Sequence, residues 1–237
     1  MIFRMVAENP TWGAPRMHGE LVMLGFDISE RTVSRWIRKA PRDPGLAKRW
    51  AAFLSNHREV IAAMDFFTVP TINFGMLYCF FVISHDRRRV LQYNVTRHPT
   101  SAWVIQQLRE AFPFDSSTKF LIFDRGTNFN AEVVETVKSF GITPKRTSFR
   151  SPWQNGVAER WVGNCRRDLL NHVIVLNEQH LKRLMTEYMD YYHQDRTHLT
   201  LQKATPSERL AAAANAGCNV VSMPRLGGLH HRYDLAA

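Results

Sequence analysis

Three carboxylates interrupt apolar segments of the sequence. Asp65 lies within "IAAMDFFTV", Asp124 ends the run "FLIFD", and Glu159 follows "SPWQNGVA". A carboxylate in apolar surroundings is costly unless it is hydrogen-bonded, paired or bound to a metal. Ligand sets made only of oxygen suit Mg²⁺ or Mn²⁺ rather than zinc. If the three side chains converge, they predict a site for two such ions about 4 Å apart, which could activate a nucleophile and stabilise the leaving oxygen of a phosphodiester.

Each carboxylate also has an ordinary interpretation when it is considered alone. Asp65 could lie on a strand edge, Asp124 in a turn that Gly126 permits, and Glu159 on the surface of a helix. The combination is more informative, because the end of a strand is where α/β proteins place their chemistry. Glu159 follows Asp124 by 35 positions, on a helix whose face also carries Asn155. Ser151 and Pro152 are a suitable N-cap and first residue for that helix.

The elements that must position these residues can be predicted from apolar runs and periodicity. Strands are expected at 60–69, 74–84, 88–96, 119–124 and 142–148. Helices are expected at 99–112, at about 129–140, from 151 through Glu159, and at about 178–193. Three successive antiparallel strands followed by strand–helix alternation predict an α/β fold, with a mixed five-stranded sheet flanked by helices.

Two short helices precede this region, at 14–25 and 29–39, and their connection has the length of a helix-turn-helix. Arg31, Arg35 and Arg38 would point outward from the second helix. They are either contacts to DNA or a solvated basic face, and their spacing does not distinguish the two. The segment "APRDPG" at 40–45 is typical of a linker.

The charge balance favours a polyanionic partner. The net charge is +10 and the isoelectric point is about 9.9, with basic residues concentrated at 31–49, 87–89, 145–150 and 160–167. A basic protein of this size is suited to nucleic acid, although composition alone also allows a basic protein without such a partner.

Several protein classes are disfavoured by composition. The sequence has no apolar run of membrane-spanning length and no signal-peptide pattern, so we expect a cytoplasmic protein without a membrane partner. Three widely spaced cysteines form neither a disulfide framework nor a zinc motif and are interpreted as buried small residues. His230 and His231 could bind a metal, but we expect them to lie in an irregular, exposed tail.

The motifs "MDFFTV", "FDRGTNF" and "SPWQNGVAERW", with the 35-position offset, resemble the catalytic core of retroviral integrases and bacterial insertion-sequence transposases. The segments at 9–39 and 191–210 resemble the helix-turn-helix before this core and the segment after it. The resemblance implies a ribonuclease H-like fold. It also implies an Asp, Asp, Glu triad of Asp65, Asp124 and Glu159, which would bind two Mg²⁺ or Mn²⁺ ions.

The resemblance also implies partners and further site residues. DNA would be the partner, both as mobile-element ends and as target, and the chain would act as a homo-oligomer at the bacterial nucleoid. The residues expected to line the DNA path are Asn155, Arg160, Arg166 and Arg167. The arginines could instead form a solvated helix face.

The expected organisation is a helix-turn-helix segment at 1–40, a linker and short helix at 41–59, an integrase catalytic core at 60–210 and a C-terminal tail at 211–237. The expected enzyme is a DNA transposase or integrase, a polynucleotidyl transferase of the DDE type that cleaves phosphodiesters and transfers strands. Two alternatives stay open: a ribonuclease H-like nuclease without joining activity, and a non-catalytic helix-turn-helix DNA-binding protein.

Overall fold

The computed structural model describes residues 1–9, 12–39, 44–114, 116–148, 151–210 and 219–236. The chain divides into two compact units, residues 1–56 and 57–237, each of which is described by itself. Of the linker predicted at 40–45, residues 40–43 lie outside the described part, and Pro44 and Gly45 begin a helix. No helix within the described ranges is long and apolar enough to cross a membrane.

The N-terminal unit is a small helical bundle with its own core. Its helices are α1 (Ile2–Glu8), α2 (Ala14–Met23), α3 (Glu30–Lys39) and α4 (Pro44–Asn56). Helices α2 and α3 match the two predicted helices, and Gly25 between them has a φ of +82°, a conformation that favours glycine. Met17, Leu21 and Val33 are buried together. Helix α1, which the sequence analysis did not anticipate, packs on α3 through Phe3 and Trp36, whose rings are 5.6 Å apart.

The second unit is built on a mixed five-stranded sheet, as predicted. Its strands are β1 (Ile61–Pro70), β2 (Met76–Ser84), β3 (Val90–Thr96), β4 (Phe120–Phe123) and β5 (Thr143–Arg146). The order across the sheet is β3-β2-β1-β4-β5. The β1–β2 and β2–β3 pairs are antiparallel, whereas the β1–β4 and β4–β5 pairs are parallel. Strands β1 and β2 are largely buried, which explains their nearly continuous apolar sequences.

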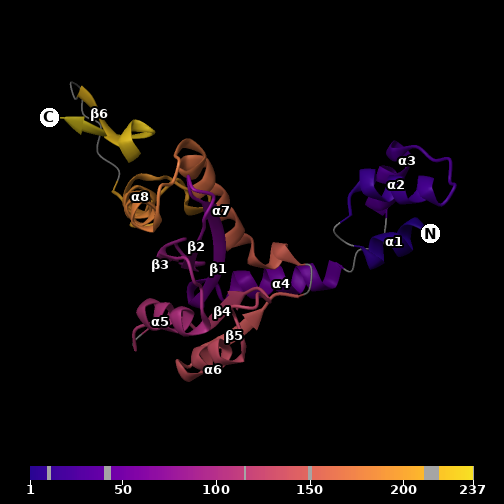
Figure 1. The fold of residues 1–237 in the computed structure, drawn as a ribbon, viewed down its shortest axis with the longest axis horizontal. Coiled ribbons are helices and arrows are strands. Elements are labelled where there is room, and N and C mark those ends of the chain that lie inside the picture. Colours follow the sequence, from indigo (N-terminus) through magenta and orange to yellow (C-terminus); the bar gives the residue numbers. More distant parts are fainter. Residues whose placement is uncertain (10–11, 40–43, 115, 149–150, 211–218, 237) are drawn as a thin grey trace. The chain divides into compact units, whose positions relative to one another are not determined.

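Helices cover both faces of this sheet (Figure 1). Helices α5 (Ser101–Ala111) and α6 (Ala131–Ser139) lie on one face, where Leu108 and Val133 join a core that includes Met64 and Phe80. Helices α7 (Gly156–Asp168) and α8 (Glu178–Asp190) lie on the other face. There the ring of Trp161 lies 4.1 Å from that of Phe81, measured between centroids. The result is a three-layer α/β/α unit.

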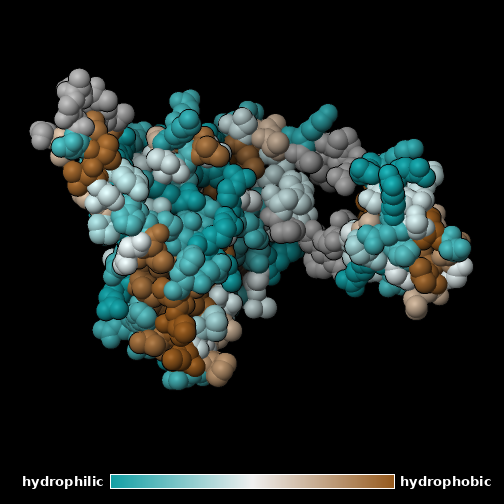
Figure 2. All heavy atoms as spheres, turned by 90° about the horizontal axis from the view of Figure 1, so that it is seen from above, coloured by the Kyte–Doolittle hydropathy of each residue, from teal (hydrophilic) through white to brown (hydrophobic). Residues whose placement is uncertain are grey.

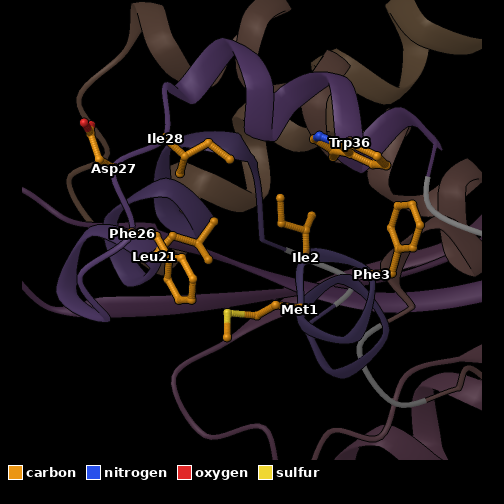
Figure 3. A pocket seen from close by; sticks show the side chains of 8 residues that line it. All are labelled: Met1, Ile2, Phe3, Leu21, Phe26, Asp27, Ile28 and Trp36. Carbon is orange, nitrogen blue, oxygen red and sulfur yellow. The ribbon is translucent and has the colours of Figure 1, made fainter.

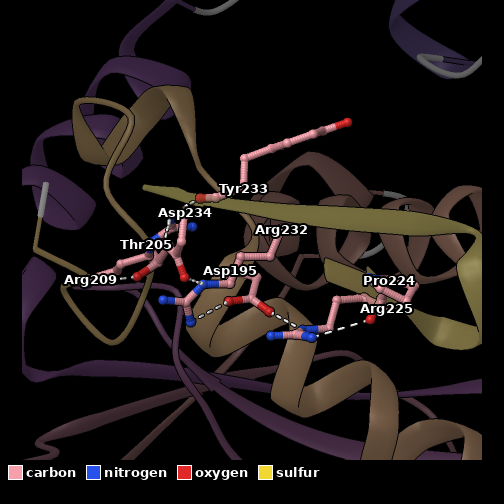
Figure 4. A network of polar contacts seen from close by, with 8 residues as sticks. All are labelled: Asp195, Thr205, Arg209, Pro224, Arg225, Arg232, Tyr233 and Asp234. Carbon is pink, nitrogen blue, oxygen red and sulfur yellow. Dashed lines mark hydrogen bonds and ion pairs between the residues drawn. The ribbon is translucent and has the colours of Figure 1, made fainter. Parts of the chain in front are cut away.

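The C-terminal segment forms a hairpin, so the expectation of an irregular tail was wrong. Strands β6 (Asn219–Arg225) and β7 (His230–Ala236) pair antiparallel. Asp195 fixes the hairpin to the π-helical turn Tyr191–Asp195, with oxygens 2.6 Å from Arg225 and 3.2 Å from Arg232 (Figure 4). His230 stacks on Tyr191 at 4.8 Å and bonds the Asp168 carbonyl. Sequence periodicity could not reveal this docking, because it depends on contacts between distant segments.

The cysteines that the structure describes, Cys79 and Cys165, are free and buried as expected, whereas Cys218 lies outside the described residues.

The helix expected from residue 151 begins differently. Pro152–Asn155 forms a 3₁₀ turn, and the α-helix starts at Gly156. This extra turn lets Asn155 point back toward the sheet, which matters for the site described next.

Candidate active site

The sheet brings Asp65 and Asp124 to the same place. Strand β1 pairs with β4 in parallel, with Ala63 opposite Ile122. Continuing this register by two residues places Asp65 alongside Asp124, just past the last paired position of the shorter strand. Asp65 is partly buried, whereas Asp124 is exposed in the loop after β4. The two aspartates therefore meet where β4 ends and solvent can enter, the position at which α/β sheets commonly hold ligands.

A glycine turn fixes the orientation of Asp124. Its Oδ1 accepts a hydrogen bond from the Gly126 amide at 2.8 Å. A Cβ at position 126 would lie 3.0 Å from the same oxygen, so a side chain there would push the carboxylate out of place. The next side chain, Arg125, donates to the Thr147 carbonyl at 3.0 Å and ties the loop to the segment after β5.

The start of α7 completes the site. Asn155, immediately before the helix, is 3% exposed, and its Nδ2 lies 3.4 Å from both Asp65 Oδ2 and the Met64 carbonyl oxygen. One turn further on, Glu159 is exposed. Apolar surroundings were predicted for all three acids, but only Asp65 has them.

Both of the other carboxylates contribute to the shifted pKa of Asp65. This pKa is raised from 3.8 to about 7, chiefly by burial and also by the negative charges of Asp124 and Glu159. The backbone N–H of Phe66, 2.7 Å from Asp65 Oδ1, acts in the opposite direction. Both other carboxylates therefore act electrostatically on Asp65, which has no cation among the causes of its shift.

The donor chemistry fits a hard divalent cation, although the side chains do not yet close around one. Within the described residues, no three His, Cys, Asp or Glu side chains have the spacing of a metal cage. Two observations favour a cation at Asp65. Its pKa is raised first by burial and also by the negative charges of Asp124 and Glu159, and the buried Oδ1 of Asn155 has no hydrogen-bond partner among the described residues. Asp124 and Glu159 are exposed, so rotation of their side chains would tighten the group.

Comparison with known proteins agrees with this architecture. The model of the family described as "Integrase core domain" matches residues 140–206, which include α7 and α8. The chain is thus similar, over this segment, to the core domain of integrases. A protein of insertion element IS407 from Burkholderia multivorans is 20% identical over 216 residues, covering 87% of this chain and 78% of that protein. The transposase InsD of insertion element IS2 from Escherichia coli is 29% identical over 100 residues, 42% of this chain and 32% of InsD.

Solved integrase structures are similar in fold to this chain. The catalytic core domain of the HTLV-2 integrase, solved with magnesium in a dimeric form, superposes with a TM-score of 0.51. It is 14% identical, and the match covers 64% of this chain and 95% of that domain. The intasome of simian T-cell lymphotropic virus gives a TM-score of 0.52 at 14% identity, covering 76% of this chain and 67% of that one. The ribonuclease H-like fold expected from the sequence is thereby confirmed.

The predicted DNA-contacting residues of this chain occupy different environments. Arg31, Arg35 and Arg38 are exposed along one side of α3, as expected. Asn155 is buried against Asp65, so the structure gives it a supporting position for the carboxylate rather than an exposed one.

The arginines of α7 differ among themselves. Arg160 and Arg166 are exposed, and an Nη of Arg166 lies 3.4 Å from the Thr68 carbonyl oxygen. Arg167 is also exposed but is held by Asn164 Oδ1 at 2.7 Å. Arg166 therefore lies along the strand that carries Asp65, whereas the hydrogen bond of Arg167 is made within α7.

Two apolar grooves have linings that include none of the three carboxylates. In the N-terminal unit, Phe3, Leu21, Phe26 and Trp36 help line an open groove of about 440 Å³ (Figure 3). In the second unit, a groove of about 520 Å³ lies between the segments 68–74 and 166–175. Figure 2 shows apolar side chains gathered on parts of the surface of both units. Neither groove contains the convergent polar groups of a catalytic site.

Sequence reasoning missed two features of the site. It placed Asn155 on the helix face with Glu159 but did not foresee its contact with Asp65, because the 3₁₀ turn before α7 was taken as helix. It noted Gly126 as a turn residue without its hydrogen bond to Asp124. One signal could have suggested the contact between Asn155 and Asp65: an Asn that lies four residues before a candidate ligand and ends a turn begun by Pro.

Proposed function

We propose that this chain is a DNA transposase or integrase, which cleaves and joins phosphodiesters at Asp65, Asp124 and Glu159. The observation that carries the proposal is the pKa of Asp65, which burial and the charges of Asp124 and Glu159 raise to about 7. Such a carboxylate, in a family that recombines DNA, favours divalent-metal chemistry over a structural role. Because the chain spans only 32% of InsD, the activity of the whole protein is part of the proposal.

The three carboxylates would hold two Mg²⁺ or Mn²⁺ ions. Bound there, the ions supply neutralisation of phosphate charge and activation of a water or DNA 3′-hydroxyl for in-line attack. Asn155 holds the Asp65 carboxylate, and the Gly126 amide holds that of Asp124. Glu159 lies in the first turn of α7 and is exposed to solvent.

DNA would be held by basic side chains outside the triad. We propose Arg31, Arg35 and Arg38 for the helix-turn-helix unit, and Arg160, Arg166 and Arg167 for the core. The proposed organisation assigns residues 1–40 to DNA binding, 60–210 to catalysis and 211–237 to a C-terminal element. Two DNA ends must be handled together in transposition, so a homo-oligomer on DNA belongs to the same proposal.

A strand-transfer assay tests the proposal directly. The protein is incubated with duplexes of the flanking element ends, a target plasmid and Mn²⁺, and the products are separated on a denaturing gel. We expect nicked and joined products from the wild type and neither from Asp65→Asn or Glu159→Gln. Asp190→Asn is the matched control, because Asp190 is an exposed carboxylate on α8.

DNA affinity measured on the same variants separates chemistry from binding. Both triad variants should bind DNA within about twofold of the wild type, because no basic residue is changed. Nicking without joining by the wild type would favour a ribonuclease H-like nuclease, and DNA binding without metal-dependent cleavage would favour a non-catalytic DNA-binding protein. Strand transfer by Asp65→Asn at the wild-type level would refute the assignment of the triad.

A further inference from the structure

An open cavity of about 450 Å³ lies where the C-terminal hairpin meets the rest of the second unit. Its walls come from the end of α7, from the segment that begins with the π-helical turn, and from strand β7. The arginines that line it are Arg196, Arg209 and Arg232, and the carboxylates that line it are Asp168 and Asp195. The charged side chains of this arginine cavity therefore carry one net positive charge.

The ion pairs beside the arginine cavity form an alternating row with an arginine at each end (Figure 4). Arg209 lies 2.9 Å from Asp234, which also lies 2.8 Å from Arg232. Arg232 in turn lies 3.2 Å from Asp195, and Asp195 lies 2.6 Å from Arg225. Three arginines therefore share two carboxylates, so the row is not neutral.

The arginines of the cavity are more exposed than its carboxylates. The side chains of Arg196, Arg209 and Arg232 keep 21%, 29% and 28% of their surface exposed. Asp168 keeps 15% and is held by Arg196 at 2.7 Å, whereas Asp195 keeps only 4%. An ion that enters from solvent therefore meets guanidinium groups rather than carboxylate oxygens.

Arg209 and Arg232 also have N–H donors that no described residue accepts. A guanidinium group has five N–H donors in a planar fork that matches an oxyanion. Arg209 donates only through Nη2, to the Tyr233 carbonyl at 2.6 Å and to Asp234 at 2.9 Å. Arg232 donates through Nη1 to Asp195, and its buried Nε makes no hydrogen bond, although Asp234 Oδ2 is 2.8 Å away. Neither arginine makes a bidentate contact among the described residues, so much of each fork is available to a ligand.

A neighbouring cavity of about 420 Å³ has the opposite charge. This acidic cavity shares Asp195 and Arg232 with the arginine cavity, and its other charged residues are Glu187, Asp190 and Arg225. Its charged side chains carry one net negative charge. The two sides of the row of ion pairs thus differ in sign, and only the arginine cavity favours an anion.

We propose that Arg196, Arg209 and Arg232 bind one phosphate-type oxyanion in the arginine cavity. Its oxygens accept from guanidinium N–H groups, and its charge offsets the arginine excess. Because Arg232 belongs to the hairpin and Arg196 follows the π-helical turn, the bound ion joins the hairpin to the rest of the unit. The oxyanion is either a free phosphate ion or a backbone phosphate of DNA, and the second source rests on the proposed function.

The first experiment titrates inorganic phosphate into the full chain in chelator, so that metal chemistry plays no part. Affinity is measured by calorimetry, and amide hydrogen exchange of residues 219–236 is compared in phosphate and in chloride of equal ionic strength. We expect saturable phosphate binding and slower exchange in the hairpin, because the ion contacts both sides of the cavity. Absence of saturable binding, or equal exchange in the two salts, would overturn the proposal.

Two arginine variants separate the cavity from the docking of the hairpin. Arg209→Gln should weaken phosphate affinity by roughly tenfold or more, as expected for loss of a charge-assisted contact. Arg225→Gln is the matched control, because Arg225 also holds the hairpin, 2.6 Å from Asp195, but lines only the acidic cavity. It should keep phosphate affinity within about threefold, since only a screened charge is lost. Equal losses in the two variants would mean that phosphate binding merely follows docking, and would refute the site.

Asp234→Asn tests the charge argument by a gain of affinity, which misfolding does not produce. Asp234 pairs with Arg209 and Arg232 but is not part of the cavity lining. Its neutralisation adds one to the positive excess and releases guanidinium donors, so phosphate should bind several-fold more tightly. Unchanged or weaker phosphate binding would contradict the proposal.

A DNA arm identifies the source of the oxyanion. Duplex affinity of the wild type and of Arg209→Gln is measured in phosphate-free buffer, with and without added phosphate at constant ionic strength. If DNA supplies the oxyanion, the variant binds DNA more weakly and added phosphate competes only with the wild type. If free phosphate fills the cavity, DNA affinity is the same for both proteins. None of these measurements requires metal or strand transfer, so failure of this proposal is distinguishable from failure of the proposed function.

Discussion

Replacing Asp65 by Asn should stabilise the metal-free protein, and the gain should depend on pH in a defined way. The pKa of Asp65 is about 7 in the folded protein and close to 3.8 in an unfolded chain. Below the lower value both states carry the proton, and the carboxyl group costs nothing. Between the two values only the unfolded chain releases the proton, so the free energy of unfolding falls as the pH rises.

The size of the effect follows from the same two pKa values. They differ by about three pH units, and each unit corresponds to about 1.4 kcal/mol, so the maximum cost is about 4 kcal/mol. This cost is reached above pH 7, where the folded protein must also ionise Asp65. Asn has nearly the same shape, can accept from the Phe66 amide and never ionises, so Asp65→Asn avoids the cost.

The assay is urea unfolding in chelator, followed by tryptophan fluorescence at several values between pH 4 and pH 8.5. The stability difference between Asp65→Asn and the wild type should be small near pH 4, rise through pH 5 to 7 and level off above. Other titrating groups cancel in the difference. Adding Mg²⁺ at pH 8 should stabilise the wild type but not the variant, whereas NaCl of equal ionic strength should stabilise neither selectively.

Two results would refute this reasoning. A stability difference that is flat with pH would mean that Asp65 ionises normally in the folded protein. Equal stabilisation of both proteins by Mg²⁺ would mean that the ion binds elsewhere. The control Asp190→Asn should show neither the pH-dependent gain nor the loss of the Mg²⁺ effect, because its carboxylate is exposed.

Three further predictions concern the other parts of the chain. Replacing Arg31, Arg35 and Arg38 together by Ala should weaken DNA binding and reduce the salt slope by about three, and an unchanged slope would contradict the recognition-helix assignment. Limited proteolysis should cut first near 40–48 and leave a core that begins before residue 60, whereas a first cut inside 100–160 would contradict that boundary. Asp195→Asn should destabilise the hairpin by about 2 kcal/mol, because two arginines lose a carboxylate that is only 4% exposed. Hydrogen exchange should become faster only in the hairpin and its docking segment, and unchanged protection there would contradict the prediction.

The sheet could be predicted because its signals are local. Strand β1 is apolar on both faces, and the turns after β1 and β2 are short, so three antiparallel neighbours followed from the sequence pattern. The C-terminal hairpin was not predicted. Its strands are short and mostly polar or exposed, and its position depends on Asp195 and Tyr191, which are far away in the sequence.

The sequence by itself determined which residues could do chemistry: three carboxylates at recognisable motifs, a basic balance and two helices of helix-turn-helix length. The tertiary structure decided what each of them experiences. The parallel register of β1 and β4 placed Asp65 beside Asp124, the 3₁₀ turn aimed Asn155 at Asp65, and burial raised the pKa of Asp65. The physical reason is that desolvation and Coulomb interactions depend on distance in space, which the order of residues along a chain does not specify.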